Sequence, residues 1–107
     1  MPPRACFEIG SYYHLYNRGN NYQDIFFCRD NYLHFLRLLR RHLVEQSIDL
    51  LAYCLMPNHY HLLIQSQTLD VSSRMRSLSL AYTKAINRRH GRVGSLFQGR
   101  FQSICVE

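Results

Sequence analysis

The sequence predicts an α+β domain in which an antiparallel sheet carries two helices on one face. Three observations support this fold class. The chain has 107 residues, 47% of them hydrophobic and spread along its whole length, which is enough for one core. Four segments have the pattern of strands and two have the apolar spacing of helices, in the order strand, helix, strand, strand, helix, strand. A short turn separates the second and third strands, which implies an antiparallel hairpin.

The first half of the chain predicts a strand, a helix and a second strand. Residues 12–17 form the expected first strand, which ends before the turn-prone residues 19–21. Asp30 is the expected N-cap of a helix that runs to about Gln46. Apolar residues recur there at helical spacing and predict a buried stripe made of Tyr32, Phe35, Leu36, Leu39 and Leu43. Residues 48–55 predict the second strand.

The second half predicts a third strand, a second helix and a fourth strand. Residues 56–58 form the expected turn and residues 59–65 the third strand. The second helix is expected to begin at a cap among residues 70–73 and to end at Gly91. Its apolar stripe consists of Val71, Met75, Leu78, Tyr82, Ala85 and Ile86. Residues 101–106 complete the order β-α-β-β-α-β of the ferredoxin-like fold, which leaves the second face of the sheet open.

The net charge of +6 lies entirely in the last third of the chain. Residues 1–70 hold six basic and six acidic side chains, whereas residues 71–107 hold seven basic side chains and one glutamate. Clustered cations with so few anions predict a polyanionic partner, and nucleic acid is the partner that they favour. The other interpretation is a solvated basic helix. The residues expected to contact nucleic acid are Arg74, Arg76, Lys84, Arg88, Arg89, Arg92 and Arg100.

The cysteines and the hydropathy pattern predict a reduced, cytoplasmic protein. The four cysteines are Cys6, Cys28, Cys54 and Cys105, and no two of them have zinc-knuckle spacing. Cys54 lies in an apolar run, which is typical of a buried free thiol. The longest apolar runs are too short to cross a bilayer, and the start of the chain lacks the apolar stretch of a signal peptide. We therefore expect no membrane partner.

The sharpest chemical feature is the pair His59 and His61 on the expected third strand. Side chains alternate along a strand, so residues two apart share a face, with Cα atoms about 6.6 Å apart. Two imidazoles at that distance can converge on one cation. Taken alone, the pair also fits two structural histidines. The alternation places an apolar set under the helices, namely Tyr60, Leu62 and Ile64, and leaves Leu63 and Gln65 with the histidines on the open face.

The residues around the histidine pair resemble a known family. The stretch from Leu55 to Ile64 is similar to the HUH motif of single-tyrosine transposases, and its flanks resemble the branch called REP-associated tyrosine transposases. The resemblance covers about residues 12–106. The further blocks that carry it are residues 13–20, 25–26, 82–84, 87–91 and 94–101.

The resemblance implies a chemistry and a set of ligands. Members of that family serve mobile elements and cut single-stranded DNA, often at the foot of a hairpin. A divalent ion, Mg²⁺ or Mn²⁺, is held by two histidines and one polar side chain and polarises the phosphate. A tyrosine then attacks and leaves a 5′-phosphotyrosine link. Matching the motif assigns His59 and His61 as the metal ligands, and the family's monomers and dimers allow a homodimer.

In the family, the tyrosine lies on a further helix after the fourth strand, four residues before the Asn or Gln that supplies the third ligand. This sequence ends at Glu107, where that segment would begin. The expectation is therefore one domain over residues 1–107 that binds DNA, lacks its catalytic helix and is inactive by itself. No catalytic residue is assigned. Tyr82 is the tempting substitute nucleophile, but its place on the apolar stripe predicts a core residue.

Two other functions fit parts of the pattern. A non-catalytic module that binds single-stranded nucleic acid could share the fold, although the RNP1 block of RNA-recognition domains is absent from the expected strand. A hydrolase with a two-histidine metal site would need a nearby carboxylate, and neither Asp49 nor Asp70 has the spacing. His14 on the first strand could line the open face near the metal, although a structural role is favoured. His90, at the basic helix end, is expected to contact phosphate or solvent.

Overall fold

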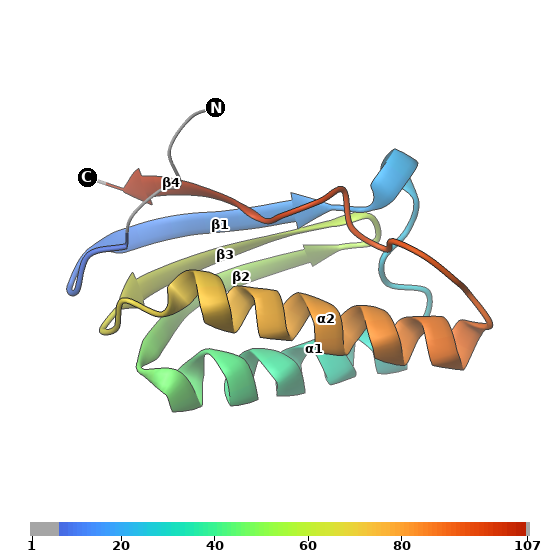
Figure 1. Cartoon of the computed structure of the whole chain (residues 1–107), viewed down its shortest axis with the longest axis horizontal. Helices are drawn as coiled ribbons and strands as arrows, with labels where there is room; N and C mark the ends of the chain where they lie inside the picture. The colour runs from blue at the N-terminus through green and yellow to red at the C-terminus, as the bar shows by residue number, and fades with distance from the viewer. Residues whose placement is uncertain (1–6, 107) are drawn as a thin grey trace.

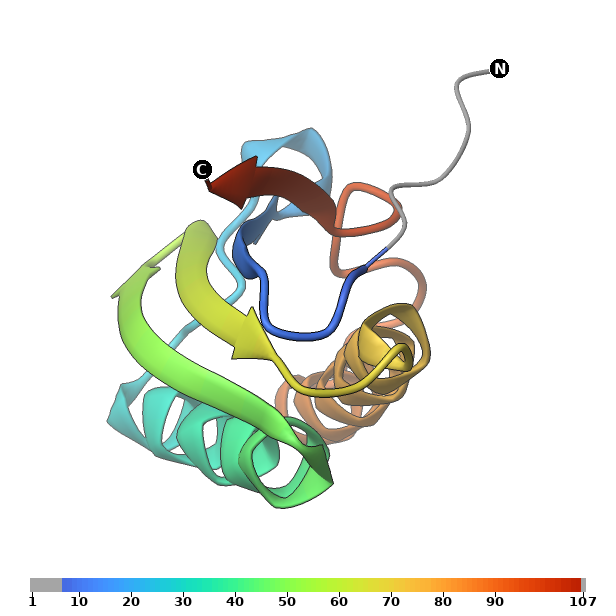
Figure 2. The same ribbon diagram turned by 90° about the vertical axis from the view of Figure 1, so that its left-hand side faces the viewer.

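Four strands and two helices form two layers in the computed structural model, which describes residues 7–106. The sheet has the order β2-β3-β1-β4, and both helices cover one of its faces (Figures 1 and 2). This is the predicted α+β, ferredoxin-like arrangement. The elements are β1 (Tyr12–Arg18), α1 (Arg29–His42), β2 (Ile48–Met56), β3 (His59–Ser66), α2 (Val71–His90) and β4 (Gln102–Val106), with short 3₁₀ turns η1 (Asn20–Tyr22) and η2 (Val44–Gln46).

The pairing of the strands decides which side chains become neighbours. All three pairs are antiparallel, and β1 lies between β3 and β4. In the β1–β3 pair, Tyr16 is opposite His61 and Arg18 is opposite His59. Directly opposite residues point to the same face of a sheet. The open face of β1 is therefore continuous with the histidine-bearing face of β3.

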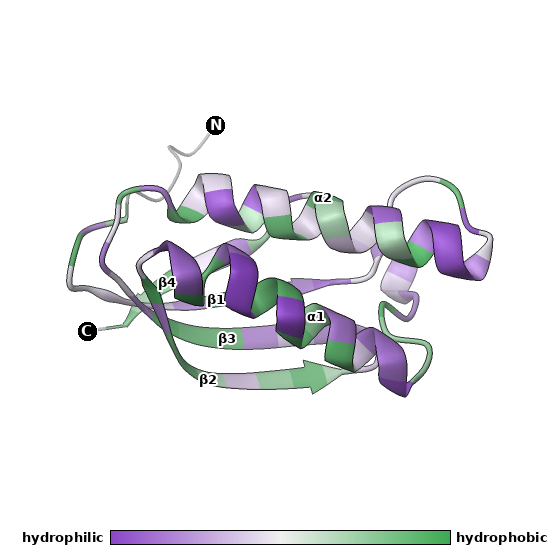
Figure 3. Cartoon of the chain, turned by 90° about the horizontal axis from the view of Figure 1, so that it is seen from below, coloured by the Kyte–Doolittle hydropathy of each residue, from purple (hydrophilic) through white to green (hydrophobic). Residues whose placement is uncertain are grey.

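The core lies between the sheet and the two helices. Leu62 and Ile64 of β3 alternate with half-buried neighbours and are at most 1% exposed. Burial of such side chains contributes roughly 1.5–3 kcal/mol each, which makes the two-layer packing the main source of stability. In Figure 3, hydrophilic and hydrophobic residues alternate along the ribbons of both helices. The helix residues that reach the core include Phe35, Leu38 and Leu39 of α1 and Met75, Leu78, Tyr82 and Ile86 of α2.

The ends of the first helix differ from the prediction. The N-cap is Cys28, and Asp30 lies inside the first turn, where its carboxylate accepts a hydrogen bond from Arg89 at 3.0 Å. The side chain of Asn31 instead reaches back to accept the backbone N–H of Phe27 at 2.7 Å. The α-helix ends at His42, and the residues as far as Gln46 form the separate turn η2. Local apolar spacing continues across this change of helix type, so it cannot mark the boundary.

The prediction that Cys54 is a buried thiol is wrong, because Cys54 is exposed. The strand β2 lies at the edge of the sheet, and the side chain of Cys54 is opposite His61 on the open face. An apolar run indicates burial only when the strand is covered on both faces. The neighbouring side chains Leu51 and Tyr53 are also exposed.

Backbone hydrogen bonds draw three loops together at the end of the sheet that carries His59. The N–H of Gly19 donates to the carbonyl of Asn58, and the N–H of Asn20 donates to the carbonyl of Leu96, both at 2.9 Å. Gln98 donates to the carbonyl at the end of β1 over the same distance. The histidine end of the sheet is therefore braced by main-chain contacts. No helix in residues 7–106 is long and apolar enough to cross a membrane.

Candidate functional site

His59 and His61 lie on the same, open face of the sheet, as their spacing predicts. Both side chains are half-buried and alternate with the buried Tyr60 and Leu62. The centroids of the two imidazole rings are 5.1 Å apart. This spacing on one face is compatible with a shared cation, whereas metal binding itself stays a prediction.

Hydrogen bonds orient both imidazoles through the same ring atom. The Nδ1 of His59 lies 2.8 Å from the Oδ1 of Asn58, and an amide oxygen accepts only, so this Nδ1 carries the proton. The Nδ1 of His61 lies 2.8 Å from the Nε2 of His14. When Nδ1 of an imidazole makes a hydrogen bond, the Nε2 atom of the same ring is available to a metal. Hydrogen bonds of this kind set the tautomer and the orientation of metal-binding histidines.

The protonation state of His61 also suits a ligand. Burial, followed by the charges of His14 and His59, lowers the pKa of His61 from its ordinary value of 6.5. The neutral imidazole, which is the form that binds metals, is therefore favoured at neutral pH. A lowered pKa also links the protonation of His61 to folding. The contribution of neutral His61 to the free energy of unfolding is present above pH 6.5 and is lost as the pH falls toward the lowered pKa.

The chain offers two imidazole ligands at this site. Within residues 7–106, no three His, Cys, Asp or Glu side chains are grouped so that they could hold a metal ion. His14 is close, but its Nε2 is engaged with the Nδ1 of His61 and so supports the ligand. Two neutral nitrogen donors fit a divalent ion that keeps other ligands, and imidazole suits Mn²⁺ better than Mg²⁺.

Tyr16 also belongs to this site, although no sequence motif indicates it, and His14 lies nearer the histidine pair than a purely structural role implies. Both side chains lie on the open face of β1, where the Tyr16 ring centroid is 5.0 Å from that of His14 and 6.0 Å from that of His61. The alternation along residues 12–18 could have placed both on one face. Their meeting with His61 depends on the pairing of β1 with β3, which no local pattern encodes.

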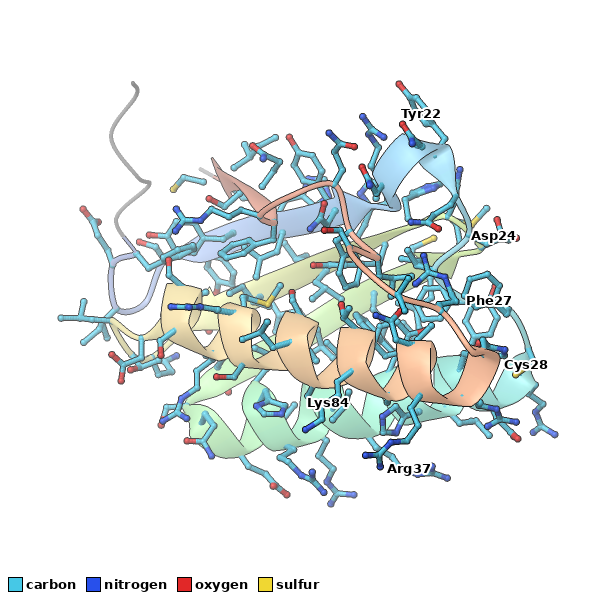
Figure 4. All side chains as sticks on the ribbon, turned by 45° about the vertical axis from the view of Figure 1, so that its right-hand side comes forward. Tyr22, Asp24, Phe27, Cys28, Arg37 and Lys84 are labelled. Atoms are coloured by element: carbon cyan, nitrogen blue, oxygen red, sulfur yellow. The ribbon has the colours of Figure 1, made fainter. Side chains whose placement is uncertain are left out.

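The seven basic residues do not form one free surface. Arg89 pairs with Asp30 at 3.0 Å. Arg92 donates to the side chains of Asn87 and Gln23, each at 2.6 Å, and so braces the loop after α2. Lys84 projects from the outer side of the helix layer (Figure 4). On α2, the Arg74 side chain is half-buried, and the Arg88 side chain, near the end of the helix, is exposed.

Two of the basic residues meet at a groove. Arg76 of α2 and Arg100 of the following loop both line a groove of about 1000 Å³. Phe101, the last residue of that loop, and Gln102, the first residue of β4, line the same groove. Spacing along the sequence does not bring Arg76 and Arg100 together, because 23 residues separate them. The two arginines meet because the chain returns from α2 to the edge of the sheet.

His90 and Tyr82 have structural roles. The Nε2 of His90 lies 3.2 Å from the Oδ1 of Asn31 and the side chain is half-buried, so one ring nitrogen has a partner within the domain, while contact of His90 with phosphate or solvent stays a prediction. Tyr82 is fully buried, and its hydroxyl donates to the carbonyl of Ile25 at 2.6 Å. Burial raises the pKa of Tyr82 further above its ordinary value, which makes the hydroxyl a poor nucleophile. The prediction that Tyr82 is a core residue is confirmed.

Two buried tyrosines should respond in opposite ways to the loss of the hydroxyl. The Tyr60 hydroxyl is buried and has no hydrogen-bond partner among residues 7–106. Tyr60→Phe is therefore expected to raise the free energy of unfolding by about 1 kcal/mol. Tyr82→Phe breaks the bond to Ile25 and should lower it by about 1–2 kcal/mol. Urea unfolding of the two variants measures both shifts, and equal shifts in one direction would contradict this assignment.

Comparisons with known proteins bear on the fold and on the family of this chain. No curated protein matches the chain. The chain is similar to a solved REP-associated tyrosine transposase bound to a REP hairpin, with a TM-score of 0.78 and 16% identity. That match covers all of this chain and 62% of the other, so this chain spans less than two thirds of the length of that transposase. A protein from Deinococcus radiodurans R1 assigned as a transposase is similar over all of this chain and 87% of its own, with a TM-score of 0.70 and 17% identity.

At 16% and 17% identity, the two solved structures show the fold of this chain and no more. The family is shown by the sequence itself. Residues 9–107 match the sequence profile of the family described as transposase IS200 like, which is nearly the whole chain. The chain therefore belongs to the IS200-like transposase family.

Proposed function

We propose that this chain is a DNA-binding transposase domain that takes part in metal-dependent cleavage and rejoining of single-stranded or hairpin DNA through a 5′-phosphotyrosine intermediate. The observation that carries the proposal is the pair His59 and His61, oriented through Nδ1 on the open face. Membership of the family supports it. The similar REP-associated tyrosine transposase is described as bound to a REP hairpin, which supports DNA as the partner.

The residues of the chain have defined tasks in this proposal. His59 and His61 would hold Mg²⁺ or Mn²⁺ through their Nε2 atoms, while Asn58 and His14 keep the rings in place. When bound, the ion would act as a Lewis acid on the scissile phosphate. Because both imidazoles are neutral, they would leave the positive charge of a bound ion available to the phosphate.

A nicking assay tests the proposal. The chain is incubated with a labelled hairpin that carries a single-stranded flank, with and without Mn²⁺. We expect binding of the hairpin without a denaturation-resistant adduct, because Tyr82 is buried and no other tyrosine of the chain is assigned as the nucleophile. An adduct that disappears in Tyr16→Phe would assign the nucleophile to Tyr16, the tyrosine whose ring lies near His61. Failure to bind the hairpin at low salt would overturn the proposed function.

The salt dependence of DNA binding should identify the arginines that contact phosphate. Arg88 is exposed, and Arg88→Ala is expected to reduce the slope of log affinity against log salt by about 0.7–0.9 if it contacts one phosphate. Arg89→Ala should change the slope less, because Asp30 already holds the Arg89 guanidinium. Arg40→Ala is the control and should leave the slope unchanged, because Arg40 lies at the end of α1 beside Glu45, whereas Arg37 of α1 (labelled in Figure 4) shares a groove with Arg89. Unchanged slopes in Arg88→Ala, Arg76→Ala and Arg100→Ala would move the DNA surface away from residues 74–100.

The second candidate function is a non-catalytic module that binds single-stranded nucleic acid. The observation that favours it is the lack of a three-ligand group among residues 7–106. DNA affinity that does not change with Mn²⁺, together with no measurable Mn²⁺ binding, would select this alternative. A cytoplasmic location and a homodimer stay predictions.

A further inference from the structure

A strained backbone holds one aromatic side chain out in the solvent. Asn21 and Tyr22 have φ values of 54° and 59°, so two successive residues other than glycine are left-handed. The Tyr22 side chain is 70% exposed and points away from the body of the domain in Figure 4. A bulky residue in this conformation is strained, and such strain persists only where the surrounding structure enforces it. Neither burial nor a core contact explains why a tyrosine occupies this position.

The surrounding loops enforce the conformation. The amide of Gln23 donates to the carbonyls of Ser95 and Leu96, each at 3.2 Å. The guanidinium of Arg92 donates in turn to the Oε1 of Gln23 at 2.6 Å. At the other side of η1, a Cβ added to Gly19 would lie 1.9 Å from the carbonyl oxygen of Gln23, so the turn is closed tightly. The Tyr22 ring is therefore presented from a braced turn.

A cation covers one side of the exposed ring. The guanidinium carbon of Arg18 lies 4.0 Å from the centroid of the Tyr22 ring. Arg18 is the last residue of β1 and is opposite His59 on the open face of the sheet. The stacked pair of Arg18 and Tyr22 thus lies at the histidine end of the sheet, and the high exposure of Tyr22 leaves ring surface for a further planar group.

We propose that Tyr22 is a stacking platform for one unpaired base of the DNA strand that passes His59 and His61, with Arg18 beside the phosphate of that nucleotide. The inference rests on the proposed function and names the feature that the site recognises. An unpaired base offers its flat face to a protein side chain without unstacking a duplex, and aromatic rings stack on such bases with little regard to sequence. The positive charge beside the ring favours a polyanion over an apolar protein segment.

A tryptophan probe tests the contact directly, because the chain contains no tryptophan. In Tyr22→Trp, the indole fluorescence is expected to fall by about half or more on titration with a hairpin that carries a single-stranded flank. A blunt duplex of the same length should quench it little. Tyr53→Trp is the matched control, since Tyr53 is 53% exposed on β2 but pairs with Leu62, whose side chain points to the opposite face from the histidines.

A second variant removes the ring without loss of the fold. Asparagine enters the left-handed region more readily than tyrosine, so Tyr22→Asn should keep the thermal midpoint within about 4 °C of the parent chain. Its affinity for the flanked hairpin should fall about 5- to 100-fold, the loss expected for one stacked base. Tyr22→Phe keeps the ring and should remain within about twofold of the parent chain.

The outcomes separate the inference from the function on which it rests. Unchanged affinity in Tyr22→Asn and no quenching in Tyr22→Trp, with the parent chain still binding the hairpin, would overturn the stacking platform and leave the proposed function standing. Equal quenching of the Tyr22→Trp fluorescence by the blunt duplex and by the flanked hairpin would overturn the inference that the stacked base is unpaired. Failure of the parent chain to bind any DNA would overturn both the function and the inference.

Discussion

Replacement of His61 by alanine is expected to lower the affinity of the chain for Mn²⁺ by at least about 100-fold. Loss of a supporting residue around a metal typically costs 10–100-fold in affinity, and loss of a ligand costs at least the upper end of that range. His59→Ala should have a similar effect, because the two rings lie 5.1 Å apart on one face. Isothermal titration with Mn²⁺, supported by the electron paramagnetic resonance signal of the free ion, measures the loss.

The supporting residues provide an internal scale for this experiment. His14→Ala removes the partner of the His61 Nδ1, and Asn58→Ala removes the partner of the His59 Nδ1. Each is expected to lower Mn²⁺ affinity by about 10-fold or more, less than loss of a ligand does. His90→Ala is the control, since His90 is paired with Asn31 at the end of α2. Equal Mn²⁺ affinity in the parent chain, His61→Ala and His59→Ala would show that the ion binds elsewhere.

Gly19→Ala is expected to lower the free energy of unfolding by about 3 kcal/mol, at the upper end of the usual cost of overpacking. The φ of Gly19 is −67°, so the backbone conformation does not require glycine. The lack of space requires glycine, because an added Cβ would lie 1.9 Å from the carbonyl oxygen of Gln23. That atom belongs to the backbone and cannot swing aside. The thermal midpoint should therefore fall by about 12 °C or more, followed by circular dichroism.

A second glycine gives the matched control for this prediction. Gly91 ends α2 with a φ of 63°, and nothing lies within 4 Å of an added Cβ. Gly91→Asn should change the free energy of unfolding by less than about 1 kcal/mol, because asparagine tolerates the left-handed conformation. A Gly19→Ala variant as stable as the parent chain would show that the turn can open freely, which would also remove the bracing argued for Tyr22.

Elements defined by local periodicity could be predicted well. The alternation along β3 predicts that Tyr60, Leu62 and Ile64 are buried, and each is at most 1% exposed. The apolar stripe of α2 predicts a core position for Tyr82, which is fully buried. These predictions succeed because the period of side-chain direction in a strand or helix is a property of the backbone alone. Predictions fail at the helix end, where Asp30 is not the N-cap, and at the sheet edge, where Cys54 is not buried.

The sequence by itself determined the order of the elements, the face of the sheet that the helices cover and the common face of His59 and His61. Only the tertiary structure decided that His14 hydrogen-bonds His61, which lies 47 residues further along the chain. It also decided that Asp30 pairs with Arg89, 59 residues further along, so that Arg89 is not a free cation. The physical reason is that strand register and helix docking are settled by packing between distant segments. A pattern read within one segment contains the direction of each side chain but not the identity of the neighbour that it meets.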